Sequence, residues 1–376
     1  MRIAFYAPLK SPLHPVPSGD RLLARAFSSA LRAAGHDVSL AAQLRTYDRT
    51  GNETRQQRIE YVGERLAQRL VRRWERSPSR RPDLWFTYHV YHKAPDVIGP
   101  QVCRALSIPY VVAEASVAAK QEKGPWRGGY ASALAAIRRA DAVLCINPAD
   151  VAGVQSVRSD VVRLSPFFDV DGFLATVSSH RDVAKRGETP RIVVAAMMRR
   201  GNKLASFRLL ADALTRVEDE PWQLVVIGDG EAMQDVRVAF GPLGDERVRF
   251  AGAVPHEQMA AMLQAADLFV WPAVDEVIGM SLLEAQACGV PVVAGRGPGV
   301  EAVAVNGVGG ALVAHGDADA FAGAVAELLR DGERRRAMGQ RAARYVRERH
   351  DIAAASKTID AVLNDVMHRR QRRRSS

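Results

Sequence analysis

The segment that decides the fold spans residues 275–294 and reads DEVIGMSLLEAQACGVPVVA. Its pattern predicts a loop carrying Glu276, a helix that opens around residues 279–281, and a buried strand over residues 291–294. Another apolar run, over residues 268–271, predicts a strand just before the loop. Strand, loop, helix and strand in this order form the repeating unit of a parallel sheet covered by helices.

The same alternation of short apolar strands and helices fills both halves of the chain and breaks once. The break covers residues 171–190, which hold few large apolar side chains and are therefore predicted to be a linker. We predict an α/β fold with two Rossmann-like, doubly wound parallel-sheet domains that face a central cleft. The predicted parts are an N-terminal domain (1–170), the linker (171–190), a C-terminal domain (191–350), and a final helix (351–376) that crosses back to the N-terminal domain and ends in a basic tail.

The overall composition predicts a globular protein of a reducing compartment. The chain has 376 residues, of which 47% are hydrophobic and 25% charged, and this length suits two domains. Its 3 cysteines are scattered, so we expect neither a disulfide framework nor a structural zinc site. The first residues hold too short an apolar run for a signal peptide, and no stretch reaches the ~18 apolar residues of a spanning helix. The expected location is cytoplasmic.

The net charge of +10 comes largely from two basic segments. Arginines recur between residues 55 and 76 around apolar residues at helical spacing, and the tail over residues 369–374 is almost entirely arginine. Two interpretations stay open for the first segment. It is either a helix that lies on an anionic membrane, which would place the protein peripherally at the inner membrane face, or a solvated helix that covers its own domain. No nucleic-acid partner is expected.

The residues at the start of the predicted helix indicate a diphosphate site. The amides of Gly279, Met280 and Ser281 have no partner within the helix, and the positive end of the helix dipole lies there. Glu284, in an early turn, suits hydrogen bonds from ribose hydroxyls. Glu276, in the loop, suits a sugar hydroxyl just beyond the phosphates.

A second segment, residues 197–203, supplies positive charge. It follows a predicted strand and carries Arg199, Arg200 and Lys203. A leaving nucleoside diphosphate gains negative charge in the transition state, and fixed cations stabilise it most at that point. Gly228, at the end of another predicted strand, allows a further close approach of backbone to ligand.

Taken in order, these motifs resemble the family 4 glycosyltransferases. The signature of that family is Glu-x7-Glu in a stretch like EGFGxxxLEAxAxGxPVV, and Glu276 and Glu284 have this spacing. Other similar runs in the predicted C-terminal domain are GDG (228–230), FAGAVP (250–255), ADLFVWP (266–272) and GGALV (309–313). The N-terminal domain matches more weakly, through PSGD (17–20), AGHDV (34–38) and IPYVV (108–112).

The resemblance implies a retaining glycosyltransferase that moves a sugar from a UDP- or GDP-sugar to an acceptor hydroxyl, as hexosyltransferases do. It implies the GT-B fold, with a donor-binding C-terminal domain, an acceptor-side N-terminal domain, and no metal or other cofactor. Carried over by position, the catalytic residues are Glu276, Lys203 and Arg199. The donor-binding residues are Gly19, Gly228, Val254, Gly279, Met280, Ser281 and Glu284, with Val254 near the nucleobase and Gly19 in a first-domain loop.

The chain departs from the family pattern at two places. The family usually has an arginine five or six residues before its lysine, where this chain has methionine, so Arg199 is the first substitute and Arg200 the second. The family also often has a histidine after the strand equivalent to residues 110–112, which is missing here. Glu114 or Ser116 takes its place in contacting sugar or acceptor, or His89 reaches the same region from an earlier strand; His89 is otherwise a surface or structural residue.

Other interpretations of the sequence lead to different classes of protein. The Asp-Val-Asp run at 169–171 is reminiscent of a metal-binding motif, but aspartates at this position also support turns. A glycoside hydrolase would use two carboxylates but would leave the diphosphate features without a purpose. A nucleotide-sugar epimerase shares the fold and most donor contacts. A catalytically silent nucleotide-sugar or glycan-binding protein is compatible with the missing histidine.

Overall fold

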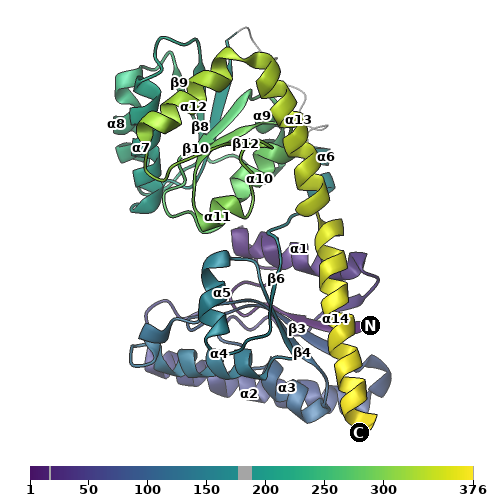
Figure 1. Ribbon diagram of the computed structural model, residues 1–376. Helices are drawn as coiled ribbons and strands as arrows, with labels where there is room; N and C mark the ends of the chain where they lie inside the picture. Colours follow the sequence, from purple (N-terminus) through teal and green to yellow (C-terminus); the bar gives the residue numbers. More distant parts are fainter. Residues whose placement is uncertain (17, 177–188, 376) are drawn as a thin grey trace. The chain divides into compact units, whose positions relative to one another are not determined.

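The chain folds into two compact units, as a computed structural model that describes residues 1–16, 18–176 and 189–375 shows (Figure 1). The first unit comprises Met1–Phe168 and Ile352–Ser376, and the second comprises Asp169–Asp351. Each unit holds one six-stranded sheet whose neighbouring strands are all parallel. The predicted α/β fold with two Rossmann-like, doubly wound parallel sheets is thereby confirmed.

The sheet of the first unit has the strand order β2-β1-β3-β4-β5-β6. Its strands are β1 (Arg2–Tyr6), β2 (Asp37–Leu40), β3 (Leu84–Val90), β4 (Tyr110–Ala115), β5 (Ala142–Cys145) and β6 (Val161–Arg163). Its helices are α1 (Gly19–Ala33), α2 (Glu53–Arg76), α3 (Gly99–Leu106), α4 (Arg127–Arg139), α5 (Pro148–Gln155) and α14 (Ile352–Ser375), with short 3-10 turns η1 (Pro78–Arg80) and η2 (Ala119–Gln121).

The sheet of the second unit has the order β12-β11-β10-β7-β8-β9. Its strands are β7 (Arg191–Ala195), β8 (Gln223–Ile227), β9 (Val248–Gly252), β10 (Leu268–Trp271), β11 (Val292–Gly295) and β12 (Gly310–Val313). Its helices are α6 (Val170–Ala175), α7 (Asn202–Thr215), α8 (Met233–Phe240), α9 (His256–Gln264), α10 (Met280–Ala287), α11 (Pro298–Glu301), α12 (Ala318–Arg330) and α13 (Gly332–Arg349), with the 3-10 turn η4 (Gly241–Leu243).

The central strands are apolar on both faces because helices cover both sides of each sheet. All residues of β4 are buried, and so are those of β10 and β11. In the first unit, Phe27 of α1 packs against Phe86 of β3, with ring centroids 5.7 Å apart. In the second unit, Phe207 of α7 packs on Trp271 of β10 at 5.1 Å. These contacts fix the helices that carry the site residues.

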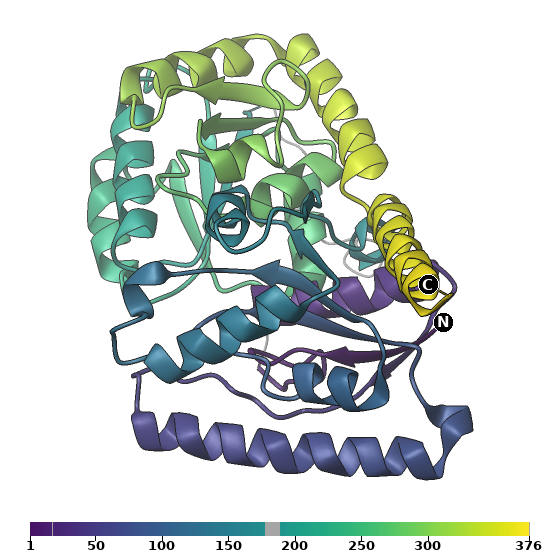
Figure 2. The same ribbon diagram turned by 60° about the horizontal axis from the view of Figure 1, so that its bottom comes forward.

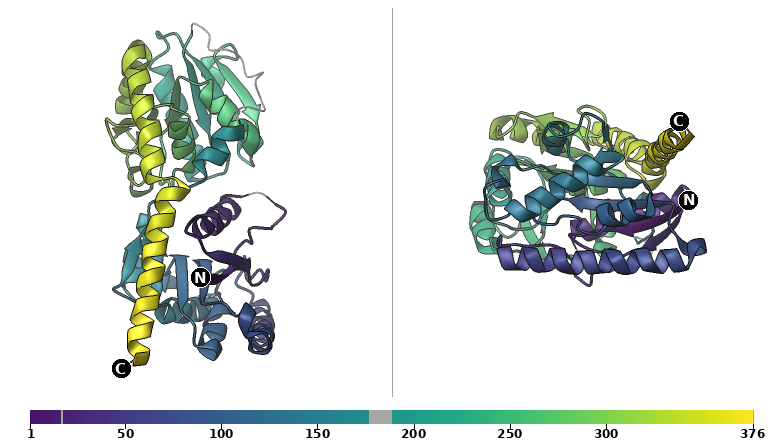
Figure 3. Two further views of the ribbon diagram at one scale, coloured as in Figure 1. Left: turned by 90° about the vertical axis from the view of Figure 1, so that its right-hand side faces the viewer. Right: turned by 90° about the horizontal axis from the view of Figure 1, so that it is seen from below.

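Helices α14 and α2 lie on opposite sides of the first unit (Figures 2 and 3). Helix α14 packs against α1, and its inward side chains are fully or almost fully buried: Ala355, Ile359, Leu363 and Val366. Asp360 of α14 lies 3.2 Å from Nε2 of His36, just before β2. The last helix of the chain is therefore an integral part of the first unit.

The predicted linker over residues 171–190 is partly wrong, because it begins inside helix α6. Asp169 caps this helix by accepting a hydrogen bond from the amide of Gly172 at 2.8 Å, and the side chain of Phe173 is buried. The sequence of α6 is too short to show a helical apolar period, which is why it resembles a turn. Residues 177–188 of the predicted linker lie outside the described residues. Among the described residues, no helix is long and apolar enough to cross a membrane.

Candidate active site

The order of the strands places two site loops of the second unit side by side. Strand β7 pairs with β8 on one side and with β10 on the other, so the chain winds in opposite directions from this point. Doubly wound sheets bind ligands at the carboxyl ends of the strands where this reversal occurs. The loop after β7 leads to Lys203, and the loop after β10 leads to Glu276.

Lys203 and Glu276 form an ion pair at this reversal point. The Nζ atom of Lys203 lies 2.5 Å from Oε2 of Glu276. The indole Nε1 of Trp271, the last residue of β10, donates a hydrogen bond to the same oxygen at 2.8 Å, and Lys203 Nζ lies 5.1 Å from the Trp271 ring centroid. The side chain of Lys203 is 28% exposed and that of Glu276 is 11% exposed. The structure thus joins two predicted catalytic residues that are far apart in sequence, and leaves Lys203 accessible to a ligand.

The loop that carries Glu276 is held in a constrained backbone conformation. Ala273 and Asp275 both adopt positive φ angles, 57° and 48°, which residues with a side chain rarely occupy. The fully buried Ser206 of α7 accepts a hydrogen bond from the amide of Val274 at 2.9 Å. Ser206 also donates to the carbonyl of Asn202 at 2.8 Å, so the helix that bears Lys203 supports the loop that bears Glu276.

The first turn of α10 offers an unused amide. Met280 N and Leu282 N are bonded to nearby carbonyls, whereas the amide of Ser281 has no acceptor among the described residues. The backbone of Gly279 has φ −79°, so its lack of a side chain serves packing instead of a left-handed turn. An added Cβ there would lie 2.6 Å from a Leu282 methyl carbon. The helix start therefore combines a free donor with the positive end of the dipole.

Glu284 lies one turn further along α10 and is half-buried. Burial raises the pKa of its carboxyl group to about 7. No hydrogen bond or ion pair to this carboxylate occurs within the described part of the chain, so nothing offsets the free-energy cost of burying its charged form. A ligand that donates hydrogen bonds to Glu284 would remove that cost.

The Gly-Asp-Gly run packs directly against the loop after β7. Gly228 has φ +140°, and a Cβ on it would lie 1.9 Å from the carbonyl oxygen of Ala196. The amide of Met198 donates to the carbonyl of Asp229 at 2.9 Å, and the amide of Gly228 donates to that of Gly252 at 2.8 Å. The loops after β7, β8 and β9 are therefore joined at one edge of the sheet. Val254, in the loop after β9, is half-buried at this edge.

Arg199 does not join the cluster of Lys203 and Glu276. Its side chain is exposed, as is that of Arg200, and neither guanidinium has an ion-pair partner in the described ranges. The neighbouring Met198 is fully buried, so an arginine at that position would have to enter the core. Lys203 is the cation that the structure places against Glu276.

The first unit repeats the arrangement at its own reversal point, between β1 and β3. Gly19 is the first residue of α1, after the N-cap Ser18, and Asp20 follows. Oδ1 of Asp20 lies 3.1 Å from Nδ1 of His89 near the end of β3, and His89 has φ +67°. Burial acts to raise the pKa of Asp20, but the hydrogen bond and charge of His89 outweigh it and hold that pKa below its usual value. Sequence reasoning missed Asp20; its place in the first loop of a doubly wound sheet was the available signal.

Glu114 and Ser116 follow at the end of the next strand, β4. The buried Glu114 carboxylate accepts hydrogen bonds from the amides of Ile146 and Asn147 at 2.8 and 3.3 Å. Glu114 has φ +61°, and burial raises its pKa despite these bonds and the nearby charge of His89. Ser116 is half-buried, and its amide donates to Val90. Glu114 thus ties two strand ends together, and its second oxygen has no hydrogen bond among the described residues.

Comparison with known proteins agrees with this architecture. Residues 179–345 match the family described as Glycosyl transferases group 1. The chain is 33% identical over 190 residues to a GDP-mannose-dependent alpha-(1-6)-phosphatidylinositol monomannoside mannosyltransferase of Mycolicibacterium smegmatis, covering 47% of this chain and 49% of that protein. It is 31% identical over 229 residues to a D-inositol 3-phosphate glycosyltransferase of Corynebacterium urealyticum, covering 56% of this chain and 54% of that one. The chain thus spans about half the length of these relatives.

A solved structure matches both units. HepE of Anabaena, crystallised with UDP, has a TM-score of 0.69 and 17% sequence identity over 97% of this chain and 100% of its own. Two doubly wound parallel sheets with this likeness define the GT-B class of folds. The chain therefore has the GT-B fold, and residues 179–345 are similar to the glycosyl transferases group 1.

Proposed function

We propose that this protein is a retaining, metal-independent glycosyltransferase that moves a hexosyl group from a UDP- or GDP-sugar to an acceptor hydroxyl. The observation that carries the proposal is the pairing of Lys203 with Glu276 at the reversal point of the second sheet. A cation paired with a carboxylate suits a phosphate on one side and a sugar hydroxyl on the other, and the free amide at the start of α10 suits the same phosphate group.

Each residue of this cluster has a proposed role in the transfer. The bond between the sugar C1 and the diphosphate oxygen breaks while the acceptor oxygen bonds to C1 from the same face, and the acceptor proton leaves with the diphosphate. Lys203 and the amide of Ser281 stabilise the charge that grows on the diphosphate. Glu276 orients the sugar through a hydroxyl. Glu284 accepts hydrogen bonds from the ribose, and Val254 lies near the base.

The proposed donor class has support from relatives. The name of the mycobacterial relative gives GDP-mannose as its donor, and the Anabaena structure holds UDP. The names of the two bacterial relatives give an inositol lipid and an inositol phosphate as acceptors. We propose an inositol-like or other polyhydroxylated acceptor for this chain, bound by Asp20, His89, Glu114 and Ser116 of the first unit.

A transfer assay tests the proposal. The protein is incubated with each UDP- and GDP-hexose in excess EDTA, with and without inositol, inositol 3-phosphate and phosphatidylinositol vesicles, and nucleoside diphosphate release is measured. Release that depends on one donor and one acceptor, with a glycosylated product, supports the proposal. Conversion of the sugar without acceptor would identify an epimerase, and tight donor binding without turnover would identify a silent binding protein. Activity that EDTA abolishes and manganese restores would refute metal independence.

We also propose that α2 holds the protein on an anionic membrane, at the cytoplasmic face of the inner membrane. Gly63, Ala67, Leu70 and Trp74 form the buried face of this helix. Its outer face carries six arginines without an ion-pair partner among the described residues, and the exposed Tyr61 (63%) lies among them. These arginines are Arg58, Arg65, Arg69, Arg72, Arg73 and Arg76. A cationic face with an exposed aromatic residue suits a bilayer surface.

Vesicle sedimentation tests the membrane proposal. Wild-type protein should sediment with phosphatidylcholine vesicles that contain phosphatidylglycerol and stay in solution with phosphatidylcholine alone. Replacement of Arg65, Arg69 and Arg72 by glutamine should abolish sedimentation. The control replaces Arg336, Arg344 and Arg349 of α13 by glutamine, which changes the net charge equally. Equal loss in both variants would show that only total charge matters and would exclude a specific α2 surface.

A further inference from the structure

A cluster of arginines lies at the amino edge of the first unit's sheet, away from the strand ends that carry His89 and Glu114. It forms where the last turn of α4, the approach to β6 and the last turns of α14 meet around a hollow of about 240 Å3. Six arginines and two aspartates line this hollow, which leaves four positive charges in excess. The arginines are Arg138, Arg139, Arg158, Arg369, Arg370 and Arg373, and the aspartates are Asp141 and Asp160.

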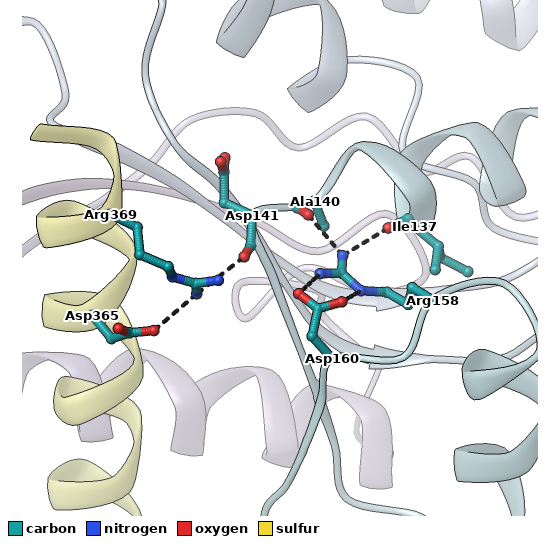
Figure 4. A network of polar contacts seen from close by, with 7 residues as sticks. All are labelled: Ile137, Ala140, Asp141, Arg158, Asp160, Asp365 and Arg369. Atoms are coloured by element: carbon teal, nitrogen blue, oxygen red, sulfur yellow. Dashed lines mark hydrogen bonds and ion pairs between the residues drawn. The ribbon is translucent and has the colours of Figure 1, made fainter. Parts of the chain in front are cut away.

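Three of the arginines are fixed by bonds to acidic side chains, and Figure 4 shows those of Arg158 and Arg369. Arg158 forms a two-pronged pair with Asp160 at 2.9 and 2.6 Å, and Arg370 does the same with Asp141 at 3.3 and 3.2 Å. Arg369 pairs with Asp365 at 2.9 Å. Every acidic side chain of the cluster thus already has an arginine partner.

The remaining three arginines, Arg138, Arg139 and Arg373, are exposed and have no ion-pair partner among the described residues. These three arginines are not needed to cap the carbonyl groups at the end of α4. Arg158 already donates to the carbonyls of Ile137 and Ala140, at 3.0 and 2.7 Å, so the last carbonyls of that helix have a cationic partner. Like charges gathered around one hollow repel each other unless an anion lies between them.

We propose that this arginine cluster binds a phosphate monoester or diphosphate group. Guanidinium groups bind phosphate oxygens through paired hydrogen bonds, and Arg158, Arg369 and Arg370 are already oriented by their aspartates. The unpaired Arg138, Arg139 and Arg373 supply the charge that the phosphate neutralises. Because the cluster lies at the sheet edge opposite to the site residues of this unit, it binds a second ligand and not the sugar acceptor.

A groove next to the arginine cluster distinguishes two sources of the phosphate, a phospholipid and a soluble phosphate compound. Asp160 and Arg369 also line a second hollow of about 710 Å3, between β6 and α14, whose apolar lining includes Val161, Ala361 and Val362. A phospholipid would place its phosphate on the arginines and part of an acyl chain in this groove. A soluble phosphate compound would use the arginines alone.

The experiment measures binding in the full chain with Lys203→Ala, Arg65→Gln, Arg69→Gln and Arg72→Gln as the background, so that neither the proposed donor site nor the proposed membrane face of α2 competes for the probes. Inorganic phosphate and pyrophosphate are titrated by calorimetry, and sedimentation is measured with phosphatidylcholine vesicles with and without phosphatidic acid. The test variant carries Arg138→Gln, Arg139→Gln and Arg373→Gln. The control carries Arg336→Gln, Arg344→Gln and Arg349→Gln in α13. Unchanged melting temperatures show that both remain folded.

We expect the test variant to bind pyrophosphate at least about tenfold more weakly than the control, since each lost charged hydrogen bond costs about a factor of ten or more. Loss of pyrophosphate binding alone supports a soluble phosphate ligand. Loss of sedimentation with phosphatidic acid as well supports a phospholipid. Equal binding in test variant and control, or no binding of either probe by the control, overturns the proposal.

Discussion

Lys203 and Glu276 are 73 positions apart in sequence but 2.5 Å apart in space. We predict that Lys203→Ala and Glu276→Ala each lower kcat for sugar transfer by about 10²-fold or more, since the first removes a cation that stabilises the leaving diphosphate and the second removes the carboxylate that orients the sugar. Arg208→Ala, an exposed cation on the same helix, is the control and should retain full activity. Near-normal transfer by both Lys203→Ala and Glu276→Ala would refute the site, provided that their melting temperatures match the wild type.

Glu284 leads to a prediction about pH. Its carboxyl pKa of about 7 lies well above its usual value, so the apoprotein holds it largely protonated below neutrality. Ionisation of this group therefore costs stability as pH rises through the interval between its unfolded and folded pKa values. A nucleotide whose ribose donates hydrogen bonds to the carboxylate favours the ionised form and releases a proton.

Nucleotide affinity should therefore rise about tenfold between pH 6 and pH 8. Calorimetry in buffers of different ionisation enthalpy would detect the released proton. Glu284→Gln should bind more weakly and lose both the pH dependence and the proton release. The same pH dependence in Glu284→Gln would assign it to another group.

At the scale of elements, Ser206 links α7 to the loop after β10. We predict that Ser206→Ala lowers the free energy of unfolding by about 1–3 kcal/mol, because the partly buried amide of Val274 loses its acceptor. The rate of sugar transfer should fall as well, because the loop that carries Glu276 loses its support. We expect both a lower kcat and a higher KM. Thr215→Ala, which removes a hydroxyl bonded only within α7, is the matched control for urea unfolding and kinetics. Wild-type stability of Ser206→Ala would contradict the proposed support.

The elements also show how far the sequence predicts the molecule. Short apolar runs such as YVV (110–112) and LFVW (268–271) predicted strands because both faces of a parallel sheet are buried. The loop and helix after Trp271 were predicted from the residue pattern that follows this strand. Helix α6 was missed because so short a segment has no measurable period. The pair of Asp20 with His89 was missed because it depends on strand order, and strand order comes from long-range pairing that local patterns do not contain. The exposure of Arg199 was also missed, because it depends on which residue of the loop is buried, and that residue is Met198.

At the scale of the whole molecule, the last helix completes the first unit. Leu363 of α14 is fully buried. We predict that Leu363→Ala lowers the stability of the first unit by about 2–5 kcal/mol through lost burial and the cavity left behind. His368→Ala, an exposed position on the same helix, should leave it unchanged. Two-phase thermal unfolding, with only the transition of the first unit shifted, would confirm that α14 belongs to that unit; an unchanged melting curve would contradict it.

The measurement that tests the central claim most directly is nucleotide binding by the wild type and by Glu284→Ala. UDP, GDP and ADP are each titrated calorimetrically into the full chain, with thermal shift as an independent readout. We predict that UDP or GDP binds saturably, and that Glu284→Ala abolishes this binding while remaining folded. Failure of the folded wild-type protein to bind any of the three, or undiminished binding by Glu284→Ala, would contradict the donor site built on α10.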